Sequence, residues 1–326
     1  MKRCVTILSH SLFALIVLAA TAWAATALWL HLSGALRLGA EAALACGALC
    51  ALAARFARSR RSGWAVLAIG AMVVGGWYQT ITPRDDRSWA LDVSRGVKAQ
   101  VAGDIVTLRD LRDFDWSSAT QATPRWITGR YDLRRIETVD MFTSVWDNPD
   151  IAHLLVSFGF ADGEHVVFSV EIRREAGEEF NEIGGFFRQF ELVLIGATEN
   201  DIVKLRSNYR KEKVRMFPIL LTPEQRRAMF LSYVALAQKL EARPAFYNTL
   251  TANCTTVVYQ LATVLKPDLP LDWRLVLSGY LPDYLAGLGV LGGNGPLQDR
   301  KAAAEITARA LRADPAIPFS RAIRQP

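Results

Sequence analysis

The chain has 326 residues, of which 51% are apolar and 21% are charged, a composition that excludes a disordered tail, a collagen-like fibre and a small disulfide scaffold. Its first 82 residues hold seven basic residues and one acidic residue, so the remaining 244 carry 31 of each sign and are neutral. The basic excess flanks long apolar runs, which is typical of membrane topology rather than of a phosphate-binding face. We therefore expect no nucleic acid partner.

Residues 1–82 are predicted to form a membrane region with about three transmembrane helices. The first apolar stretch, residues 5–32, has no acidic residue, lysine or arginine and exceeds the roughly 20 residues that a bilayer crossing needs. The second, residues 36–55, contains Glu41, and the third runs over residues 63–82. A cleaved signal peptide is the alternative for the first stretch, but its apolar core is too long for one.

A cluster of arginines separates the second and third stretches and predicts their orientation. The cluster consists of Arg55, Arg58, Arg60 and Arg61. The positive-inside rule places it in the cytoplasm, together with the basic amino terminus. Three crossings then predict a multi-pass protein of the inner (cytoplasmic) membrane, with residues 83–326 in the periplasm. The alternative is that the second and third stretches form one interfacial hairpin, which leaves the first stretch as the single crossing.

Residues 83–326 are predicted to form one extracytoplasmic α+β domain, which is long enough for a hydrophobic core. Strand-like patterns cover residues 104–108, 131–139, 151–160, 165–173, 190–195 and 214–220. A helix follows Thr222, with Pro223 at its first position and Gln225 completing a capping box. A second helix opens at residues 253–254 and ends before Pro267, and a third covers about residues 299–312.

The outer domain contains one cysteine, Cys254, and two histidines, His153 and His165. This set falls short of the usual zinc ligand count, so we expect no metal. Cys254 has two interpretations. It is either a small buried apolar residue or a reactive thiol, because Asn253 is a good N-cap and the first turn of a helix favours a thiolate.

An Asp-Gly pair at residues 162–163 predicts a hairpin between the strands at 151–160 and 165–173. A loop of residues 162–164 pairs apolar residues along one face of both strands. On the other face this register places His153 opposite Arg173 and leaves Glu171 one diagonal away, within reach of the imidazole. His165 falls opposite Ala161 near the loop, where we expect a surface histidine.

The order of a strand histidine followed by an Asn-Cys that opens a helix resembles the circularly permuted NlpC/P60-type thiol fold, a papain-like group. The chain also resembles the bacterial Lnb N-terminal periplasmic domain family over about residues 100–290. The stretches that carry this resemblance are residues 151–158, 169–173, 191–193 and 246–256. The resemblance implies a papain-like domain with an antiparallel sheet packed on helices.

The family takes its name from a lipoprotein intramolecular transacylase, which moves an acyl chain from the glyceryl group of a lipoprotein's first cysteine to that residue's own α-amine. The resemblance implies Cys254 as nucleophile and His153 as base, and the strand register adds Glu171 as the group that orients the base. We expect N–H groups at the start of the Cys254 helix to hold the oxyanion. Further candidates for binding the substrate or the oxyanion are Asn253, Tyr247 and Ser169.

The predicted function is a membrane-anchored periplasmic cysteine-dependent acyltransferase that acts on lipoprotein or lipid acyl groups through a thioester, without a cofactor. One alternative is a cell-envelope cysteine peptidase or amidase that uses the same residues. Another is a non-catalytic membrane-tethered module with Cys254 buried and inert. An apolar opening beside Cys254 would favour acyl transfer over peptide hydrolysis, and the apolar stretch 184–187 is a candidate border for such a groove.

Overall fold

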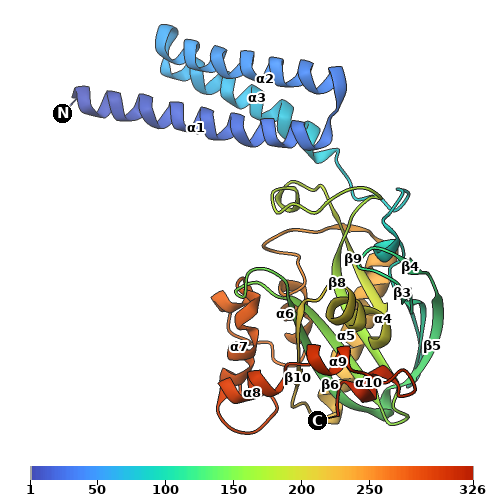
Figure 1. Cartoon of the computed structure of the whole chain (residues 1–326). Helices are drawn as coiled ribbons and strands as arrows, with labels where there is room; N and C mark the ends of the chain where they lie inside the picture. Colours follow the sequence, from blue (N-terminus) through green and yellow to red (C-terminus); the bar gives the residue numbers. More distant parts are fainter. Residues whose placement is uncertain (1, 326) are drawn as a thin grey trace. The chain divides into compact units, whose positions relative to one another are not determined.

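The computed structural model describes residues 2–325, with side chains from Val5 onward. It divides into two compact units. The first holds the chain up to Pro83 together with Ile183–Gln189, and the second holds Arg84–Glu182 and the chain from Phe190 onward. The first unit consists mainly of long helices, and the second contains the sheet (Figure 1). Each unit buries its own set of apolar side chains.

The first unit contains the helices α1 (Lys2–His31), α2 (Gly34–Ala53) and α3 (Arg60–Gln79), and a π-helical turn, η1 (Ala54–Arg58), extends α2. Among the described residues, two spans are long and apolar enough to cross a membrane, Val5–His31 and Gly34–Arg58. The third predicted crossing is present as α3, but it is not one of these spans. Two arginines at its start and four glycines lower its mean hydropathy.

Small apolar contacts hold the helices of the first unit together. Phe13 of α1 is buried with Ala51 of α2. The segment Ile183–Gln189 belongs to the same unit because Arg188 donates a hydrogen bond to the carbonyl oxygen of Tyr78 at 3.0 Å and lies over the Tyr78 ring. The apolar stretch 184–187 therefore packs with the helical unit.

Nine strands of the described chain form one sheet in the second unit. They are β1 (Lys98–Ala102), β2 (Ile105–Arg112), β5 (Trp126–Asp132), β6 (Ile136–Val145), β7 (His153–Phe160), β8 (His165–Arg173), β9 (Glu191–Ala197), β10 (Lys213–Pro218) and β11 (Ala245–Phe246). The strand order is β1-β2-β9-β8-β7-β6-β10, with β5 on β2 and β11 on β9. The short strands β3 (Asp115–Trp116) and β4 (Ala122–Thr123) pair separately.

The sheet is mixed, which corrects the expectation of an antiparallel sheet. Arg112 of β2 pairs in parallel with Ala197 of β9, whereas the other strand pairs are antiparallel. The parallel pair arises because β9 returns from the β7–β8 hairpin to lie beside the much earlier strand β2. The prediction of an α+β domain is confirmed.

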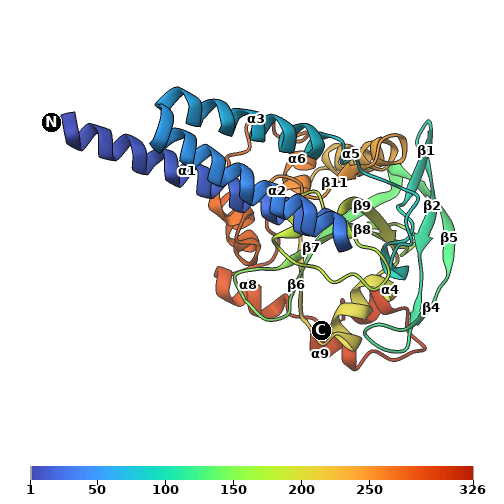
Figure 2. The same ribbon diagram turned by 90° about the horizontal axis from the view of Figure 1, so that it is seen from above.

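Helices cover both faces of the sheet. The helices α5 (Pro223–Ala242) and α6 (Thr256–Ala262) contribute to an apolar cluster with Phe158 and Phe168. The opposite face carries α4 (Glu199–Lys204), α9 (Thr307–Leu311) and α10 (Phe319–Ala322), packed around Leu155 and Val167. Figure 2 shows α5 and α6 on the other side of the sheet from α4 and α9. The helices α7 (Leu281–Gly287) and α8 (Leu297–Ala303) follow α6.

The capping box predicted for α5 is confirmed. The Thr222 hydroxyl accepts from the Gln225 N–H at 3.3 Å, and the Gln225 side chain accepts from the Thr222 N–H at 2.9 Å. The prediction of one strand over residues 131–139 is wrong. A 3-10 turn, η3 (Leu133–Arg135), separates β5 from β6 there, because Asp132 accepts from the Arg134 N–H and caps the turn. The helix predicted over residues 299–312 is likewise split into α8 and α9.

The β7–β8 hairpin has a register two residues away from the predicted one. Leu155 pairs with Ser169, and Gly159 pairs with His165, so the loop consists of residues 161–163. A shift of two residues keeps every side chain on its predicted face, because strand side chains alternate with a period of two. The apolar face is therefore as expected, whereas the cross-strand neighbours of His153 change.

Candidate functional site

The corrected register brings a histidine and a carboxylate together at the open end of the β7–β8 hairpin. Continuing the pairing of Leu155 with Ser169 places His153 directly opposite Glu171, rather than opposite Arg173 as predicted. His153 Nε2 lies 3.0 Å from Glu171 Oε1, and the two side chains are only 11% and 17% exposed. The structure thus places the expected pair in direct contact.

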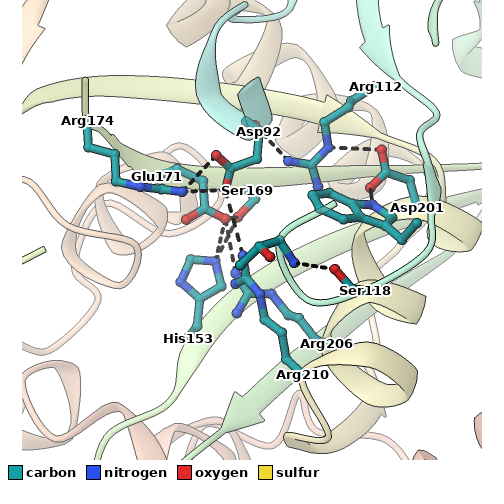
Figure 3. A network of polar contacts seen from close by, with 12 residues as sticks. Asp92, Arg112, Ser118, His153, Ser169, Glu171, Arg174, Asp201, Arg206 and Arg210 are labelled. Atoms are coloured by element: carbon teal, nitrogen blue, oxygen red, sulfur yellow. Dashed lines mark hydrogen bonds and ion pairs between the residues drawn. The ribbon is translucent and has the colours of Figure 1, made fainter. Parts of the chain in front are cut away.

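Ser169 completes this contact, in a role the sequence did not indicate. Its hydroxyl donates to Glu171 Oε1 at 2.7 Å and lies 2.8 Å from His153 Nε2 (Figure 3). An Nε2–H donor that reaches both Ser169 and Glu171 fixes the plane and the tautomer of the imidazole. Ser169, predicted as a substrate or oxyanion contact, thus bridges His153 and Glu171 in the structure.

Cys254 lies in a turn two residues before α6, which corrects its predicted place as the first helical residue. Asn253 caps this turn: its side-chain oxygen accepts from the N–H groups of Thr255 at 2.9 Å and Thr256 at 2.8 Å. The sequence suggested that N–H groups at the start of this helix hold the oxyanion. These two N–H groups are not available for that role, because Asn253 already accepts their hydrogen bonds. The cap holds the Cys254 turn in a defined shape.

The structure brings the half-buried Cys254 thiol to His153, about one hundred residues earlier in the chain. Burial raises the pKa of the thiol, but its hydrogen bond and charge interaction with His153 outweigh this effect, so its pKa is lowered below 9.0. Burial and Arg206 lower the pKa of His153, but Glu171 and Cys254 outweigh them and raise it to about 9. Each of the two groups thus stabilises the charged form of the other, as in a thiolate–imidazolium pair.

Glu171 is held as a carboxylate by its neighbours. Burial raises its pKa, but His153, Arg206 and Ser169 together hold it well below 4.5. Arg206 donates to Glu171 Oε1 at 3.2 Å and also donates to Glu212 Oε2 at 3.2 Å. Arg206 and Glu212 are functional candidates that sequence reasoning missed.

The backbone around Arg206 explains why no sequence pattern reveals it. Arg206 belongs to a π-helical turn, η5 (Leu205–Tyr209), which directly follows α4. Turns of this kind occur frequently at functional sites. Without the fold, Arg206 is one of several basic residues in a charged segment and has no visible partner.

An apolar cavity of about 190 Å³ lies beside Cys254 in the second unit. It is lined by strands β6 and β7 and by α6 and α7, through residues such as Met141, Leu154, Val258 and Tyr284. Thr255, the neighbour of Cys254, lines it too. One buried water needs about 15 Å³ on this scale, so the cavity has room for a chain of several heavy atoms.

Tyr247 lies near the Cys254 thiol, whereas the apolar stretch 184–187 and His165 lie elsewhere. Burial raises the pKa of Tyr247, and the charge of Cys254 raises it further. The apolar stretch 184–187 does not line the cavity and belongs to the first unit. His165 is half-buried beside Asp140 and Glu199, so its prediction as a surface histidine is wrong.

The model of the Lnb N-terminal periplasmic domain family matches residues 122–279. This part of the chain belongs to that family. The matched segment contains His153, Glu171, Arg206 and Cys254, so the whole constellation lies within the Lnb N-terminal periplasmic domain. No curated protein and no solved structure matches the chain.

The family and the apolar helices together indicate the location of the protein. The family is defined by a periplasmic domain, and α1 and α2 qualify as a membrane anchor by length and composition. The chain is therefore a membrane-anchored protein with a periplasmic domain of the Lnb N-terminal type.

Proposed function

We propose that the protein is a periplasmic thiol acyltransferase in which Cys254 carries an acyl group as a thioester. The position of Cys254 carries this proposal. Its thiol interacts with His153 and with the backbone of Leu154, and the Leu154 side chain lines the apolar cavity. A reactive thiol placed between a base and an apolar cavity suits a substrate with a carbonyl group and a hydrocarbon chain.

The first chemical step would transfer the acyl group to the enzyme. The Cys254 thiolate attacks the ester carbonyl, the carbon–sulfur bond forms, and the ester carbon–oxygen bond breaks. The His153 imidazolium gives its proton to the departing alcohol oxygen. Because Nε2 is engaged with Glu171 and Ser169, Nδ1 is the nitrogen that exchanges this proton.

The second step would regenerate the thiolate. A neutral amine attacks the thioester carbonyl, His153 takes the proton of the amine, and an amide is released as the carbon–sulfur bond breaks. Within the described residues, neither the Cys254 N–H nor the Tyr247 hydroxyl has a hydrogen-bond partner. We assign these two donors to the oxyanion, in place of the N–H groups that Asn253 occupies.

The apolar cavity would hold the acyl chain. The residues that line it come from β6, β7, α5, α6, α7 and the loops between them, and most of them are apolar, with Lys266 as the charged residue of the lining. A lipid or lipoprotein acyl chain matches this lining, whereas a cell-wall peptide would bury polar groups without partners. This difference favours acyl transfer over the peptidase or amidase alternative.

Two finer features complete the proposal. A strand histidine that precedes an Asn-Cys turn supports a permuted NlpC/P60-like arrangement of the second unit. In the membrane, α3 would act as a third crossing, because an odd number of crossings takes the chain from a cytoplasmic amino terminus to a periplasmic domain. It has 20 residues, begins with Arg60 and Arg61, and ends with Trp77 and Tyr78 near the interface.

The acyl-thioester itself is the decisive measurement. The full chain in detergent, with Cys4, Cys46 and Cys50 replaced by Ser, is incubated with a synthetic diacylglyceryl-cysteine lipopeptide and examined by mass spectrometry. We expect an acyl adduct on Cys254 that neutral hydroxylamine removes. A thiol that cleaves cell-wall peptides and forms no acyl adduct would instead indicate a peptidase or amidase.

A variant inside the cavity tests the acyl site separately. Ala262→Phe fills the cavity from α6, so we expect the acyl adduct to be lost while iodoacetamide still alkylates Cys254. Gln260→Phe is the matched control, because Gln260 lies on the same helix but is exposed and does not line the cavity. Equal acylation of both variants would contradict the assignment of the cavity.

A further inference from the structure

A series of alternating charges extends from the catalytic candidates into the domain. Starting at Glu171, it continues through Arg206, Glu212, Arg210, Asp92 and Arg174. Figure 3 labels these residues except Glu212. Carboxylates and guanidinium groups alternate along it, with separations between 2.9 and 4.0 Å. His153 contacts the first carboxylate and is thus the terminal cation of the series.

Arg206 is shared evenly between two buried carboxylates. Its Nη2 donates to Glu171 and its Nη1 donates to Glu212, both at 3.2 Å. Arg206 and Glu212 are only 6% and 7% exposed, so water screens these charges weakly. Ser144, which pairs with His153 across the β6–β7 ladder, donates to Glu212 and fixes the far end of this arrangement.

The charge balance around His153 depends on this sharing. Glu171, Arg206 and Glu212 together carry one net negative charge, which the imidazolium of His153 neutralises. Without the charge of Glu212, Arg206 would neutralise Glu171 alone, and a protonated His153 would lose its carboxylate counter-charge and keep only the Cys254 thiolate. The remaining charged groups near His153 are the Cys254 thiolate and, farther away, Arg210.

We propose that Glu212 is a positioning residue that acts through Arg206. By holding one side of the guanidinium, Glu212 leaves Glu171 free to act as the counter-ion of His153 and so maintains the thiolate–imidazolium pair. This inference rests on the proposed thiol chemistry and adds a regulating element to it that does not touch substrate. It also explains why two carboxylates and one arginine are buried behind the histidine.

The test is the titration of His153 itself. The full chain in detergent is labelled with ¹³C at histidine Cε1, and the His153 signal is identified from a His153→Gln variant. We expect Glu212→Gln to lower the pKa of His153 by about one unit or more. Glu212→Asp, which keeps the charge, should stay close to the unmodified chain. An unchanged pKa in Glu212→Gln would overturn the proposal.

A double variant separates positioning from general damage. Arg206→Met combined with Glu212→Gln removes one charge of each sign, so the net charge beside His153 returns to its original value. We expect the pKa of His153 to return to within about half a unit of its starting value. If Glu212 only maintained the local structure, the second substitution would add to the damage and the change in the pKa of His153 would become larger. A pKa about one unit or more below that of the unmodified chain would overturn the proposal, and this test holds even if Glu212→Gln alone does not fold.

These readouts do not depend on catalysis. If the two pKa changes occur as expected but no acyl adduct forms on Cys254, the positioning role stands and the acyl-transfer proposal fails. If an acyl adduct forms but Glu212→Gln leaves the pKa of His153 unchanged, the acyl-transfer proposal stands and the positioning role fails.

Discussion

The β7–β8 hairpin carries a buried group of histidine, carboxylate and arginine at each of its two ends. At the open end, His153 contacts Glu171, which Arg206 also contacts. At the loop end, His165 lies close to Asp140 and Glu199, with ligand atoms of the three side chains within 4.8 Å of one another. The residue types are therefore nearly the same, and the surroundings distinguish the two ends.

The loop end is closed by Arg324, a cation from the turn that follows α10. Arg324 forms two hydrogen bonds with Glu199, at 2.7 and 2.8 Å, and one with Asp140 at 2.6 Å. Ser157 donates to Glu199 as well. These contacts pair the buried carboxylates with a fixed arginine, and no cysteine of the described chain lies in this group.

The open end differs because a thiol and an apolar cavity lie beside it. Cys254 interacts with His153, and the neighbouring Thr255 lines the cavity. A histidine beside a carboxylate is thus insufficient evidence for a catalytic site in this fold. The added nucleophile and binding space are what separate a candidate active site from a structural ion-pair group.

The largest effect is expected when the open end loses its nucleophile. Cys254→Ser should abolish the acyl adduct and reduce acyl transfer by at least about 10⁴-fold, because the hydroxyl is far less ionised than the thiol. Turnover of the lipopeptide substrate by the full chain measures this loss. Cys46→Ser and Cys50→Ser are controls that should leave turnover unchanged. Full activity in Cys254→Ser would remove the distinction between the two ends.

The loop end should respond in stability rather than in reactivity. Arg324→Met leaves Glu199 and Asp140 buried without their cation, so we expect a loss of about 3–5 kcal/mol of unfolding free energy. Thermal unfolding should show a fall in Tm of about 10 °C. Arg321→Met, one turn away on an exposed position, is the control and should change Tm little. A large fall in Cys254 alkylation by the folded variant would contradict this division of roles.

Removing the open-end histidine should leave Cys254 mostly protonated at neutral pH, because burial raises its pKa and His153 no longer opposes this effect. A thiol with a pKa of 9.0 is about 1% ionised at pH 7. In the unmodified chain His153 lowers the pKa of Cys254, so a larger fraction of the thiol stays ionised below pH 9.0. His153→Ala should therefore slow iodoacetamide alkylation at pH 7 by about 10–100-fold. Its rate should then fall about tenfold for each pH unit below 9, whereas the rate in the unmodified chain stays nearly level until a lower pH. Equal pH profiles for both proteins would exclude an activated thiol.

Local patterns in the sequence predicted the parts of the site that lie on single elements. The capping box at Thr222, the apolar face of the β7–β8 hairpin and the Asn253 turn depend on residues close together in the chain. The predicted hairpin register differs by two residues from the observed one. A shift by an even number of residues keeps every side chain on the same face, so the alternation of apolar residues alone does not distinguish the two registers. The pairing of His153 with Glu171 is set by the actual loop.

Contacts between distant segments were beyond this reasoning. Arg206 reaches Glu171 only because a π-helical turn follows α4, and no periodic pattern predicts that turn. Arg324 reaches Glu199 across 125 residues, so His165 was expected at the surface when it lies in a closed group. The placement of these arginines follows from tertiary packing, which has no local signal in the sequence.

The smallest effect is expected at the loop-end histidine. His165→Ala removes a half-buried ring, but Arg324 still pairs with both carboxylates, so the stability should change by no more than about 1 kcal/mol. Alkylation of Cys254 should stay within about twofold of the unmodified chain, because Leu155 and Val167 separate the two ends of the hairpin with apolar packing. The alkylation rate at pH 7 and thermal unfolding measure both quantities on one sample. A loss of thiol reactivity comparable to that of His153→Ala would show that the two ends are coupled through the sheet, and the structural role assigned to the loop end would be wrong.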